Sequence, residues 1–486
     1  MNDARAPVVY QVYPRSFQDS DGDGVGDLVG VRSRLDHLAW LGVDALWLSP
    51  IYRSPLADFG YDVSDYTDVD PVFGDLAEFD RLAEAAHERG LKLLMDLVPC
   101  HTSIEHPWFR EHPDWYIWAD VPNNWLSAFG GSAWSHLNGR WYLHSFYPEQ
   151  PDLDWRNPEV VAAMQEVLRF WLERGVAGYR VDAIDRLLKD AQLRDDPPAS
   201  EAFGLPLSPE EAKLSLAHSR NAPDTGRALS KIREAVGDHF MVGEVYLPAA
   251  RWQPYLDAFD AVFAFELLHA DWDAEKLRRA IEATTRRPGA AWTLSNHDFG
   301  RLVTRFGPEN ARAAAMLLLT LPGTAFLYQG DEIGQADGPG AMPSPAQPAE
   351  PAASGHRSYD RAGRDRFRHP MQWTGERGGG FTSGEPWLPL VDPEHVNVEA
   401  QRDDPGSMLT LTRELIRLRR SLARDFRLLD SAPGVLAYAR GEHVVALNTT
   451  AAALPAPRGG ELVLETEPGA LRGDELAAHA AAMSRN

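Results

Sequence analysis

A stretch of alternating aspartates near the amino terminus, DSDGDGVGDLVG at residues 19–30, has the spacing of a cation-binding loop. Four aspartates match places one, three, five and nine of a calcium loop: Asp19, Asp21, Asp23 and Asp27. Val25 falls at place seven, where the ligand is a backbone carbonyl. Place twelve, where a helix-loop-helix calcium site carries a bidentate glutamate, is Gly30, so the loop is not complete. Carboxylates this close repel one another unless a cation or water screens them. The pattern favours a divalent cation over a solvated Asp-Gly turn.

A second group of polar residues comes directly after short apolar segments, in the motifs MDLVPCH, GYRVDA, GEVY and SNHD. The side chains suited to proton transfer or hydrogen bonding are Asp96, His101, Arg180, Asp182, Glu244, His297 and Asp298. Three of the carboxylates, from three different segments, converge if the segments are parallel strands of one sheet. Arg180 lies two residues before Asp182, so both side chains point to one face of their strand. We expect the guanidinium to lower the pKa of Asp182 and keep it ionised.

The segments that position these residues belong to a repeating pattern of strands and helices. Eight segments are short and apolar enough to be buried strands: VVYQVYP, ALWLSP, KLLMDLV, GYRVDAI, FMVGEV, AVFAFEL, AWTLSNHD and GTAFLYQGDE. Helical patterns separate them, and one of these predicts a helix that is capped by Asn157 and ends at Gly175. Eight such units predict an α/β fold, the (β/α)8 TIM barrel, with its active site at the carboxyl ends of the strands.

The remaining segments predict an insertion and a second domain. We expect the barrel to comprise residues 1–100 and 157–424, with a tryptophan-rich subdomain at 101–156 after the third strand and a small β-sandwich-like domain at 425–486. The six tryptophans of the insertion either form its core or stack on a ligand, and the core interpretation is favoured for each. Two irregular Pro-rich regions, 185–225 and 336–355, have no assigned role, although the second is either a loop on the active face or a disordered flap.

Composition excludes several classes of function. The chain has 486 residues and a formal net charge of −23, which argues against binding to nucleic acid. No apolar run is long enough to cross a bilayer, and the first residues lack the pattern of a secretory signal. The single cysteine, Cys100, cannot form an intrachain disulfide, which agrees with a reducing compartment. We therefore expect a cytoplasmic protein with no membrane or nucleic-acid partner.

At these motifs the sequence resembles the α-amylase family of glycoside hydrolases, in particular its oligo-1,6-glucosidase and α-glucosidase branch. The markers occur in order along almost the whole chain: QVYPRSFQDSDGDGVGDL, GYDVSDY, MDLVPCHTS, EQPDLDW, GYRVDAI, GEVY, LSNHD, YQGDEIG and RHPMQW. Most are weak alone, but nine in order are specific. The resemblance implies a TIM barrel that cleaves glucosidic bonds.

The resemblance also implies roles for individual residues. Asp182 matches the family's nucleophile, Glu244 its acid/base, and Asp298 a carboxylate that holds the sugar's 2- and 3-hydroxyls. A retaining enzyme of this kind needs its nucleophile and acid about 5 to 5.5 Å apart. The residues that match the substrate pocket are Tyr61, Asp62, His101, Arg180, His297 and Arg368. Asp62 and Arg368 would close the pocket's end and impose exo-action, unless they form a simple ion pair at its rim.

In this family the acidic loop binds a structural calcium, or sometimes magnesium, which implies the same for Asp19, Asp21, Asp23, Val25 and Asp27 of this chain. Two residues depart from the family pattern. Cys100 replaces an asparagine that offers its amide oxygen to calcium in α-amylases, so we expect no amylase-type calcium there. Ala183 stands where members that prefer α-1,6 bonds tend to carry valine, which favours α-1,4 linkages.

The function expected from the sequence is a retaining, exo-acting α-glucosidase that releases terminal glucose from short α-glucosides through a covalent glucosyl-enzyme. The alternative is an α-glucosyltransferase or a sucrose- or disaccharide-converting transglucosidase, because a sugar can intercept the same intermediate. A non-catalytic binding subunit would lack an acid or a nucleophile, and a calcium-buffering module would leave most motifs unexplained. The partner is a small α-glucoside, and the protein is expected to be a monomer or homodimer.

Overall fold

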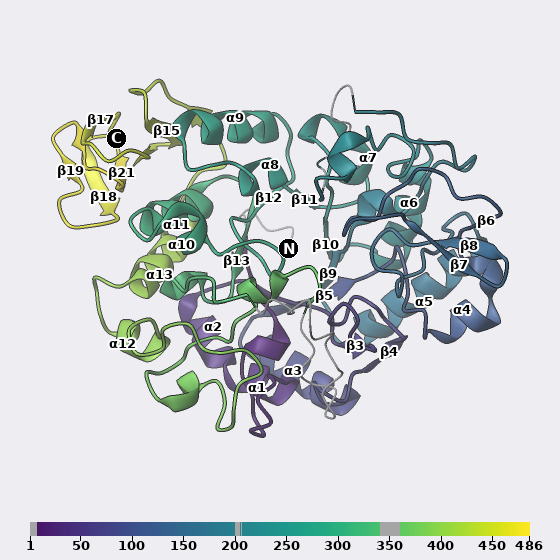
Figure 1. Ribbon diagram of the computed structural model, residues 1–486. Coiled ribbons are helices and arrows are strands. Elements are labelled where there is room, and N and C mark those ends of the chain that lie inside the picture. The colour runs from purple at the N-terminus through teal and green to yellow at the C-terminus, as the bar shows by residue number, and fades with distance from the viewer. Residues whose placement is uncertain (1–6, 200–204, 206, 341–359) are drawn as a thin grey trace. The chain divides into compact units, whose positions relative to one another are not determined.

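The computed structural model describes residues 7–199, 205, 207–340 and 360–486, and its central element is a closed barrel of eight parallel strands (Figure 1). The order of strands around the barrel is β1-β13-β12-β11-β10-β9-β5-β2. Their bounds are Val8–Val12 (β1), Ala45–Leu48 (β2), Lys92–Leu97 (β5), Gly178–Val181 (β9), Phe240–Gly243 (β10), Ala261–Phe263 (β11), Ala290–Trp292 (β12) and Thr324–Tyr328 (β13). Each coincides with one of the eight predicted segments to within one residue at its start, so the predicted TIM barrel is confirmed.

Helices follow the strands, as the pattern predicted. The α-helices are α1 (Leu28–Ser33), α2 (Leu35–Leu41), α3 (Leu76–Glu88), α5 (Pro158–Glu173), α6 (Thr225–Val236), α7 (Gln253–Leu256), α8 (Phe265–Leu268), α9 (Ala274–Thr285), α10 (Leu302–Phe306), α11 (Ala311–Thr320), α12 (Val398–Arg402) and α13 (Met408–Arg419). Short 3-10 helices are η1 (Pro14–Ser16), η3 (Ile184–Arg186), η4 (Glu211–Lys213), η5 (Ala249–Arg251), η6 (Asp331–Ile333), η7 (Arg364–Phe367) and η8 (Arg377–Gly380). In α5, the side chain of Asn157 accepts a hydrogen bond from the backbone N–H of Glu159, as expected of its cap. Gly175 follows with φ 94°, a left-handed conformation that ends the helix.

The segment after β5 contains a small antiparallel sheet. It carries α4 (Pro107–Glu111), η2 (Pro113–Trp115) and three strands in the order β6-β8-β7: Trp118–Ala119 (β6), Trp134–Leu137 (β7) and Arg140–Leu143 (β8). Trp125 stacks on Trp134 with ring centroids 6.1 Å apart, and both belong to a buried apolar cluster. The core interpretation is therefore confirmed for these two tryptophans. A separate two-stranded sheet joins β3 (Tyr52–Arg53) to β4 (Asp65–Val69).

The carboxyl-terminal residues form two antiparallel sheets. The first has the order β14-β15-β16-β21-β18, with bounds Arg427–Leu428 (β14), Val435–Arg440 (β15), His443–Asn448 (β16), Ala481–Arg485 (β21) and Glu461–Glu465 (β18). The second has the order β17-β20-β19, with bounds Leu454–Pro455, Glu475–Leu476 and Leu471–Arg472. Buried side chains of both sheets, including Val435, Ala446 and Leu476, form one core cluster.

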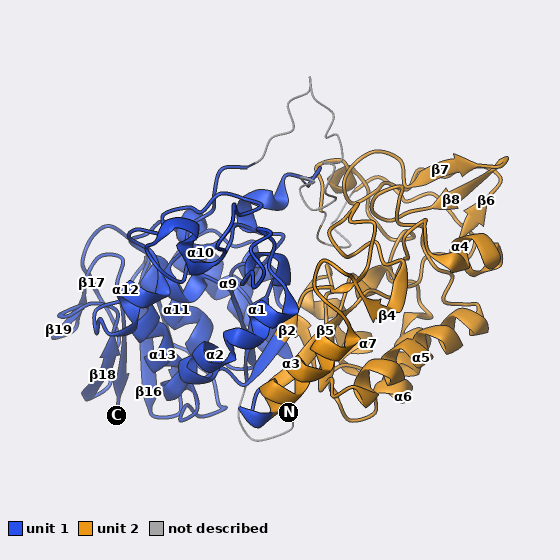
Figure 2. Cartoon of the chain, turned by 90° about the horizontal axis from the view of Figure 1, so that it is seen from below, with its two compact units in different colours: residues 1–46, 88–91, 264–486 blue, residues 47–87, 92–263 orange. Residues whose placement is uncertain are grey.

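The chain divides into two compact units, shown in blue and orange in Figure 2. The blue unit comprises Met1–Leu46, Glu88–Leu91 and Ala264–Asn486, and the orange unit comprises Trp47–His87 and Lys92–Phe263. The predicted domain boundaries describe a different division and stay a prediction. Most of the predicted loop at 336–355 lies outside the described residues. Among the residues that are described, no helix is both long and apolar enough to span a bilayer.

Close packing at the end of β10 requires a glycine immediately before Glu244. A Cβ built on Gly243 would lie 2.7 Å from Cδ2 and 2.9 Å from Cε2 of the Phe259 ring. Gly226, in the first turn of α6, has no atom within 4 Å of the corresponding position. The two glycines of the orange unit therefore allow the same substitution to be compared at a crowded site, Gly243, and at an open site, Gly226.

We predict that Gly243→Ala lowers the free energy of unfolding by roughly 1–3 kcal/mol, because the added methyl overpacks the ring of Phe259. Gly226→Ala should leave stability unchanged or raise it by about 0.5–1 kcal/mol, because alanine loses less backbone entropy in a helix. Thermal melting of the two variants beside the parent checks this. Equal melting temperatures for both variants would contradict the packing argument.

Candidate active site

Three neighbouring strands of the orange unit carry the polar residues predicted to do chemistry. In the parallel pairing of β5 with β9, Asp96 lies opposite Arg180, and β10 pairs with β9 on its other side. Asp182 directly follows β9 and Glu244 directly follows β10. Figure 1 shows β5, β9 and β10 adjacent to one another. The barrel register thus brings these side chains to the carboxyl ends of adjacent strands.

The guanidinium of Arg180 binds three carboxylates at once. Its Nη1 donates to Oδ1 of Asp96 at 2.7 Å and to Oδ1 of Asp182 at 2.6 Å. Its Nη2 lies 2.8 Å from Oε2 of Glu244. The four side chains are between 0 and 9% exposed. The two carboxylates matched to nucleophile and acid are therefore held by one buried cation.

The backbone after Asp182 is held in an unusual conformation. Ala183 has φ 41°, a left-handed value that non-glycine residues adopt only when their surroundings impose it. Its N–H donates to Oε2 of Glu244 at 2.8 Å, and its carbonyl accepts from Sγ of Cys100 at 3.1 Å. The hydroxyl of Tyr246 donates to Oε1 of Glu244 at 2.9 Å. These bonds connect Asp182 to Glu244 through the backbone as well as through Arg180.

Asp96 supports the cluster from the third strand. Its Oδ2 accepts hydrogen bonds of 3.0 Å from Nε1 of Trp47 and from the hydroxyl of Tyr61. The sequence placed Asp96 among the strand-end residues but gave it no role. The spacing of the motif could have indicated one, because Asp96 ends a buried strand next to the strand of Arg180. Tyr61, predicted to bind substrate, is thereby linked to the cluster.

The protonation of this cluster differs from the sequence prediction. The pKa of Asp182 is raised well above its usual value, because burial and the charges of Glu244 and Asp96 outweigh the opposing charge of Arg180. Burial likewise raises the pKa of Asp96 to about 6. The prediction that Arg180 lowers the pKa of Asp182 identified a real interaction but missed the larger opposing effects. Three carboxyls around one cation bind a proton more readily than an isolated aspartate does.

A second buried network lies beside Tyr61. Nε2 of His101 lies 3.0 Å from the carbonyl oxygen of Tyr61 and 3.0 Å from Nε2 of Gln150. Burial lowers the pKa of His101 to about 4, so the imidazole is neutral near pH 7. Gln150 also donates to Oδ2 of Asp58 at 2.9 Å. The structure thus brings the predicted His101 and Tyr61 together with Asp58 and Gln150, which sequence reasoning did not name.

Asp62 makes contacts with its own loop, whereas a residue that binds substrate is expected to direct its carboxylate at the sugar. It is fully buried, and its two oxygens accept hydrogen bonds of 2.8 Å from the hydroxyl of Ser54 and from the backbone N–H groups of Ala57 and Asp58. Burial raises its pKa to about 6. These bonds hold the conformation of the loop that contains Asp62. Asp58, three residues before Tyr61, is the carboxylate of this loop that contacts the His101 network.

The other predicted pocket residues belong to the blue unit and form a cluster of their own. Oδ1 of Asp298 accepts from Nη2 of Arg368 at 3.0 Å, and Nε2 of His297 lies 3.2 Å from Oδ2 of Asp298. Nε of Arg368 donates to the carbonyl of His297 at 2.9 Å. Tyr13 stacks on His297 with ring centroids 5.9 Å apart. His297, Asp298 and Arg368 are therefore brought together as the motifs LSNHD and RHPMQW predicted.

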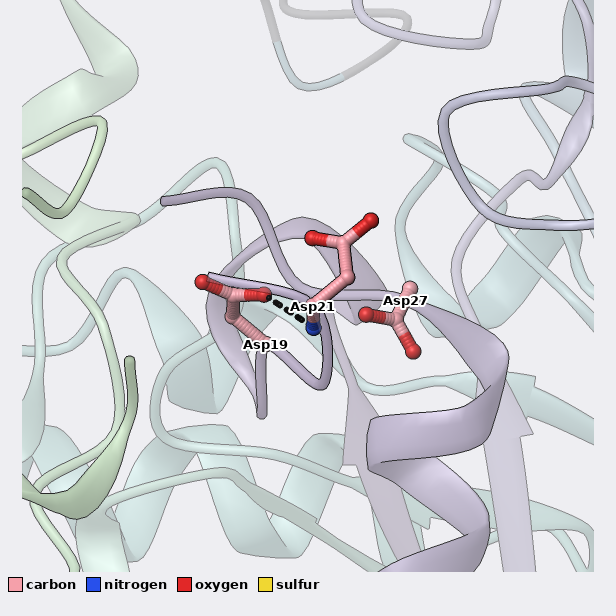
Figure 3. A group of neighbouring side chains, drawn as sticks. All are labelled: Asp19, Asp21 and Asp27. Carbon is pink, nitrogen blue, oxygen red and sulfur yellow. Dashed lines mark hydrogen bonds between the residues drawn. The ribbon is translucent and has the colours of Figure 1, made fainter. Parts of the chain in front are cut away.

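The acidic loop brings part of the predicted ligand set together. Asp19, Asp21 and Asp27 each place a carboxylate oxygen within 4.8 Å of the others (Figure 3). Oδ1 of Asp19 accepts from the backbone N–H of Asp21 at 3.0 Å, and Asp27 caps α1 through the N–H of Gly30. Asp23 lies outside this group and accepts from the N–H of Val25 at 2.7 Å. Three of the four aspartates fit a hard cation that prefers oxygen ligands.

Comparison with known proteins identifies the family. Residues 11–425 match the α-amylase catalytic domain. The chain belongs to the α-amylase family. It is 38% identical over 449 residues to an α-glucosidase of Apis mellifera, covering 85% of this chain and 78% of that one. It is 37% identical to an oligo-1,6-glucosidase of Parageobacillus thermoglucosidasius, covering 85% and 83% of the two chains.

Solved structures of this glycoside hydrolase family extend the likeness to nearly the whole chain. The α-glucosyl transfer enzyme XgtA superposes with a TM-score of 0.88 at 38% identity and covers 99% of both chains. The trehalulose synthase MutB from Pseudomonas mesoacidophila superposes with a TM-score of 0.86 at 31% identity, covering 99% of this chain and 98% of that one. The family and fold expected from the motifs are confirmed. The individual roles of the site residues stay predictions.

We predict that this glycoside hydrolase loses kcat/KM for an α-glucoside as the pH falls through a value well above the 3.9 or so of an ordinary aspartate. The sign follows from the raised pKa of Asp182, because the carboxylate form that its predicted role as nucleophile requires is lost as pH falls. Asp96→Asn removes a neighbouring carboxylate that raises the pKa of Asp182 and should therefore move this acidic limb to lower pH. The midpoint of this acidic limb is obtained by measuring kcat/KM as a function of pH, between about pH 4 and pH 8.

Asp68→Asn is the matched control, because Asp68 pairs with Arg53, its side chain is 32% exposed, and it is not among the charges that shift the pKa of Asp182. That variant should keep the acidic limb of the parent enzyme. An unchanged limb in Asp96→Asn would show that Asp96 does not influence the titration of Asp182.

Proposed function

We propose that the protein is a retaining, exo-acting α-glucosidase that releases terminal glucose from short α-glucosides, with α-1,4 linkages favoured. The observation that carries this proposal is the binding of Asp182 and Glu244 to one guanidinium, that of Arg180. Retaining hydrolysis requires two carboxyl groups close together, of which one attacks while the other carries a proton. The raised pKa values in the cluster support a shared proton near neutral pH.

In the proposed reaction, Asp182 attacks the anomeric carbon while Glu244 protonates the departing glycosidic oxygen. The bond between carbon and aglycone breaks as the bond to Asp182 forms. Glu244, now ionised, then takes a proton from water, which displaces Asp182 and releases glucose with its α configuration. Asp298 holds the 2- and 3-hydroxyls of the ring, and its place in the segment that follows β12 of the closed barrel supports this role.

We propose that the terminal glucose is bound by Tyr61, His101, His297, Arg368 and a carboxylate of the loop before Tyr61. Asp58 is the better candidate for this carboxylate. Both oxygens of Asp62 accept hydrogen bonds from its own loop, whereas Asp58 accepts one from Gln150, which also contacts His101. A carboxylate and an arginine that both bind the non-reducing end of the terminal glucose would exclude longer chains there, which would give exo-action.

A second candidate function is transfer of the glucosyl group to another sugar. The observation that favours it is the superposition with XgtA and MutB, whose names describe glucosyl transfer and trehalulose synthesis. Water and a sugar hydroxyl compete for the same covalent intermediate, so both functions use one set of residues. Glucose and transfer products measured over a range of maltose concentrations separate the two.

The acidic loop is proposed to bind a structural calcium ion, with magnesium as the possible substitute. Oxygen atoms of Asp19, Asp21 and Asp27 would supply the carboxylate ligands, with Asp23 and the carbonyl of Val25 completing the set. The ion would fix the loop between β1 and α1. We further propose that the protein is a monomer or homodimer. A location in the cytoplasm is also proposed, and it is supported by the single cysteine, which is buried and cannot form an intrachain disulfide.

The assignment of the two carboxylates predicts opposite outcomes for two variants. Asp182→Ala and Glu244→Ala should each lower kcat on α-glucosyl fluoride by on the order of 10³-fold or more. Added azide should attack the substrate directly in Asp182→Ala and give the β-glucosyl azide. In Glu244→Ala it should attack the glucosyl-enzyme and give the α-glucosyl azide. Nuclear magnetic resonance of the products distinguishes the two anomers.

In the parent enzyme, the first glucose released should be the α anomer and should come from the non-reducing end of the chain. Release of β-glucose, or near-normal turnover by either variant, would overturn the roles given to Asp182 and Glu244.

For the metal, we predict that calcium raises the melting temperature of chelator-treated enzyme, by the equivalent of about 2.7 kcal/mol at a hundredfold excess over its dissociation constant. Asp21→Asn should reduce this gain, because the amide keeps the side-chain oxygen that accepts from the N–H of Asp23 but loses the negative charge. Asp403→Asn, at an exposed acid after α12, is the control and should keep the full gain. A calcium-independent melting temperature would remove the metal proposal.

A further inference from the structure

Arg364, which lies outside the residues matched to the family's pocket, is fixed by a buried carboxylate. Its Nε donates to Oδ2 of Asp360 at 2.9 Å and its Nη2 donates to Oδ1 at 2.8 Å, so the guanidinium and the carboxylate meet through two parallel bonds. The backbone N–H of Arg364 also donates to Oδ2 of Asp360 at 2.7 Å. Asp360 is 1% exposed. Such a bidentate pair fixes the plane of the guanidinium.

The remaining arm of this guanidinium reaches the third carboxylate of the proposed reaction. Nη1 of Arg364 donates to Oδ1 of Asp298 at 3.1 Å. The same oxygen accepts from Nη2 of Arg368 at 3.0 Å, while the other oxygen faces Nε2 of His297 at 3.2 Å. Asp298 is therefore held from two directions on one oxygen. The Arg364 side chain is 11% exposed and that of Asp298 is 20% exposed.

We propose that Arg364 is a positioning residue for Asp298 and that Asp360 aligns Arg364 for this task. The inference rests on the proposed function, in which Asp298 holds the 2- and 3-hydroxyls of the glucose ring. Those hydrogen bonds strengthen as the ring distorts, so their energy depends on a carboxylate already held in place. If Arg364 is removed, Arg368 is the one arginine of this pair that still donates to Oδ1 of Asp298. The carboxylate is then held from one direction on this oxygen and is freer to rotate away from the sugar.

The charges around Arg364 support a permanent arrangement over the working pH range. Although burial opposes ionisation, the hydrogen bonds and the charge of Arg364 hold the pKa of Asp360 well below its usual range. The two arginines that meet on Asp298 repel each other, and the nearby carboxylates of Asp298 and Asp360 offset that repulsion. Arg364 thus needs Asp360 for its orientation and for its charge balance.

The test compares p-nitrophenyl α-glucoside with its 2-deoxy analogue in the parent enzyme, in Arg364→Met and in Arg364→Lys. In Arg364→Met we expect kcat/KM for the glucoside to fall about tenfold to a hundredfold, with most of the loss in kcat. The value for the 2-deoxy analogue should fall much less, so the ratio of the two substrates shrinks. Arg364→Lys keeps the positive charge but cannot make the two parallel bonds of a guanidinium. It should therefore restore part of the ratio of kcat/KM for the glucoside to that for the 2-deoxy analogue.

Arg366→Met is the matched control, because Arg366 lies on the same turn, its side chain is 50% exposed, and its guanidinium lies 3.7 Å from the carboxylate of Asp337. It should keep the parent's ratio. Asp360→Asn should shift the ratio in the same direction as Arg364→Met. Melting temperatures show whether each variant is folded at the assay temperature, and only folded variants are compared.

The inference is overturned if folded Arg364→Met discriminates between the two substrates as the parent does, or if Arg366→Met loses discrimination equally. Failure of the proposed function is a different result. In that case the parent enzyme itself would not hydrolyse the glucoside, or Asp182→Ala would hydrolyse it at the parent's rate.

Discussion

The site in the orange unit depends on the placement of one guanidinium among three carboxylates in a nearly dry interior. Burying a charge is costly unless it is paired and hydrogen-bonded, and Arg180 satisfies this condition for Asp96, Asp182 and Glu244 at the same time. Three negative groups around one positive group leave an excess of negative charge. A proton held in the cluster relieves that excess, and a mobile proton beside an ionised carboxylate is what retaining hydrolysis of a glucoside requires.

Local backbone features keep this cluster in position. Asp182 and Glu244 follow adjacent parallel strands, and a bond from the N–H of Ala183 to Glu244 links the two strand ends. That bond is made from a left-handed backbone position, whose strain the surrounding contacts must offset. Cys100, which departs from the family pattern, donates to the carbonyl of Ala183. The residue that replaces the family's asparagine thus supports the turn after Asp182.

The cluster of the blue unit uses the opposite arrangement of charges. There, two arginines, Arg364 and Arg368, converge on one oxygen of Asp298, and Asp360 holds one of them. Arg180, by contrast, is shared among three carboxylates, of which two change protonation or form a bond in the proposed reaction. Two cations on one oxygen favour the ionised form of Asp298, which is the form that the proposed role as an acceptor for sugar hydroxyls needs.

Much of this could be predicted from the sequence, because strands and helices follow from local periodicity. The eight barrel strands and the capping of α5 by Asn157 follow from patterns within short segments, and the neighbours His297 and Asp298 lie within one motif. The family followed from nine such motifs in order. In each case the deciding interaction lies within one strand, one helix or one motif whose neighbours are fixed by the parallel barrel.

Tertiary structure alone decided which groups are buried together. The spacing in the sequence predicts that Arg180 and Asp182 lie on the same face of one strand. The raised pKa of Asp182, however, depends on burial and on Asp96 and Glu244, which come from two other strands. Asp62 and Asp58 are four residues apart, and only the folded loop shows that the first bonds to its own backbone. Arg364 contacts Asp298 across 66 residues of sequence. Desolvation and charge pairing depend on distance in space, and the order of residues along the chain does not set that distance.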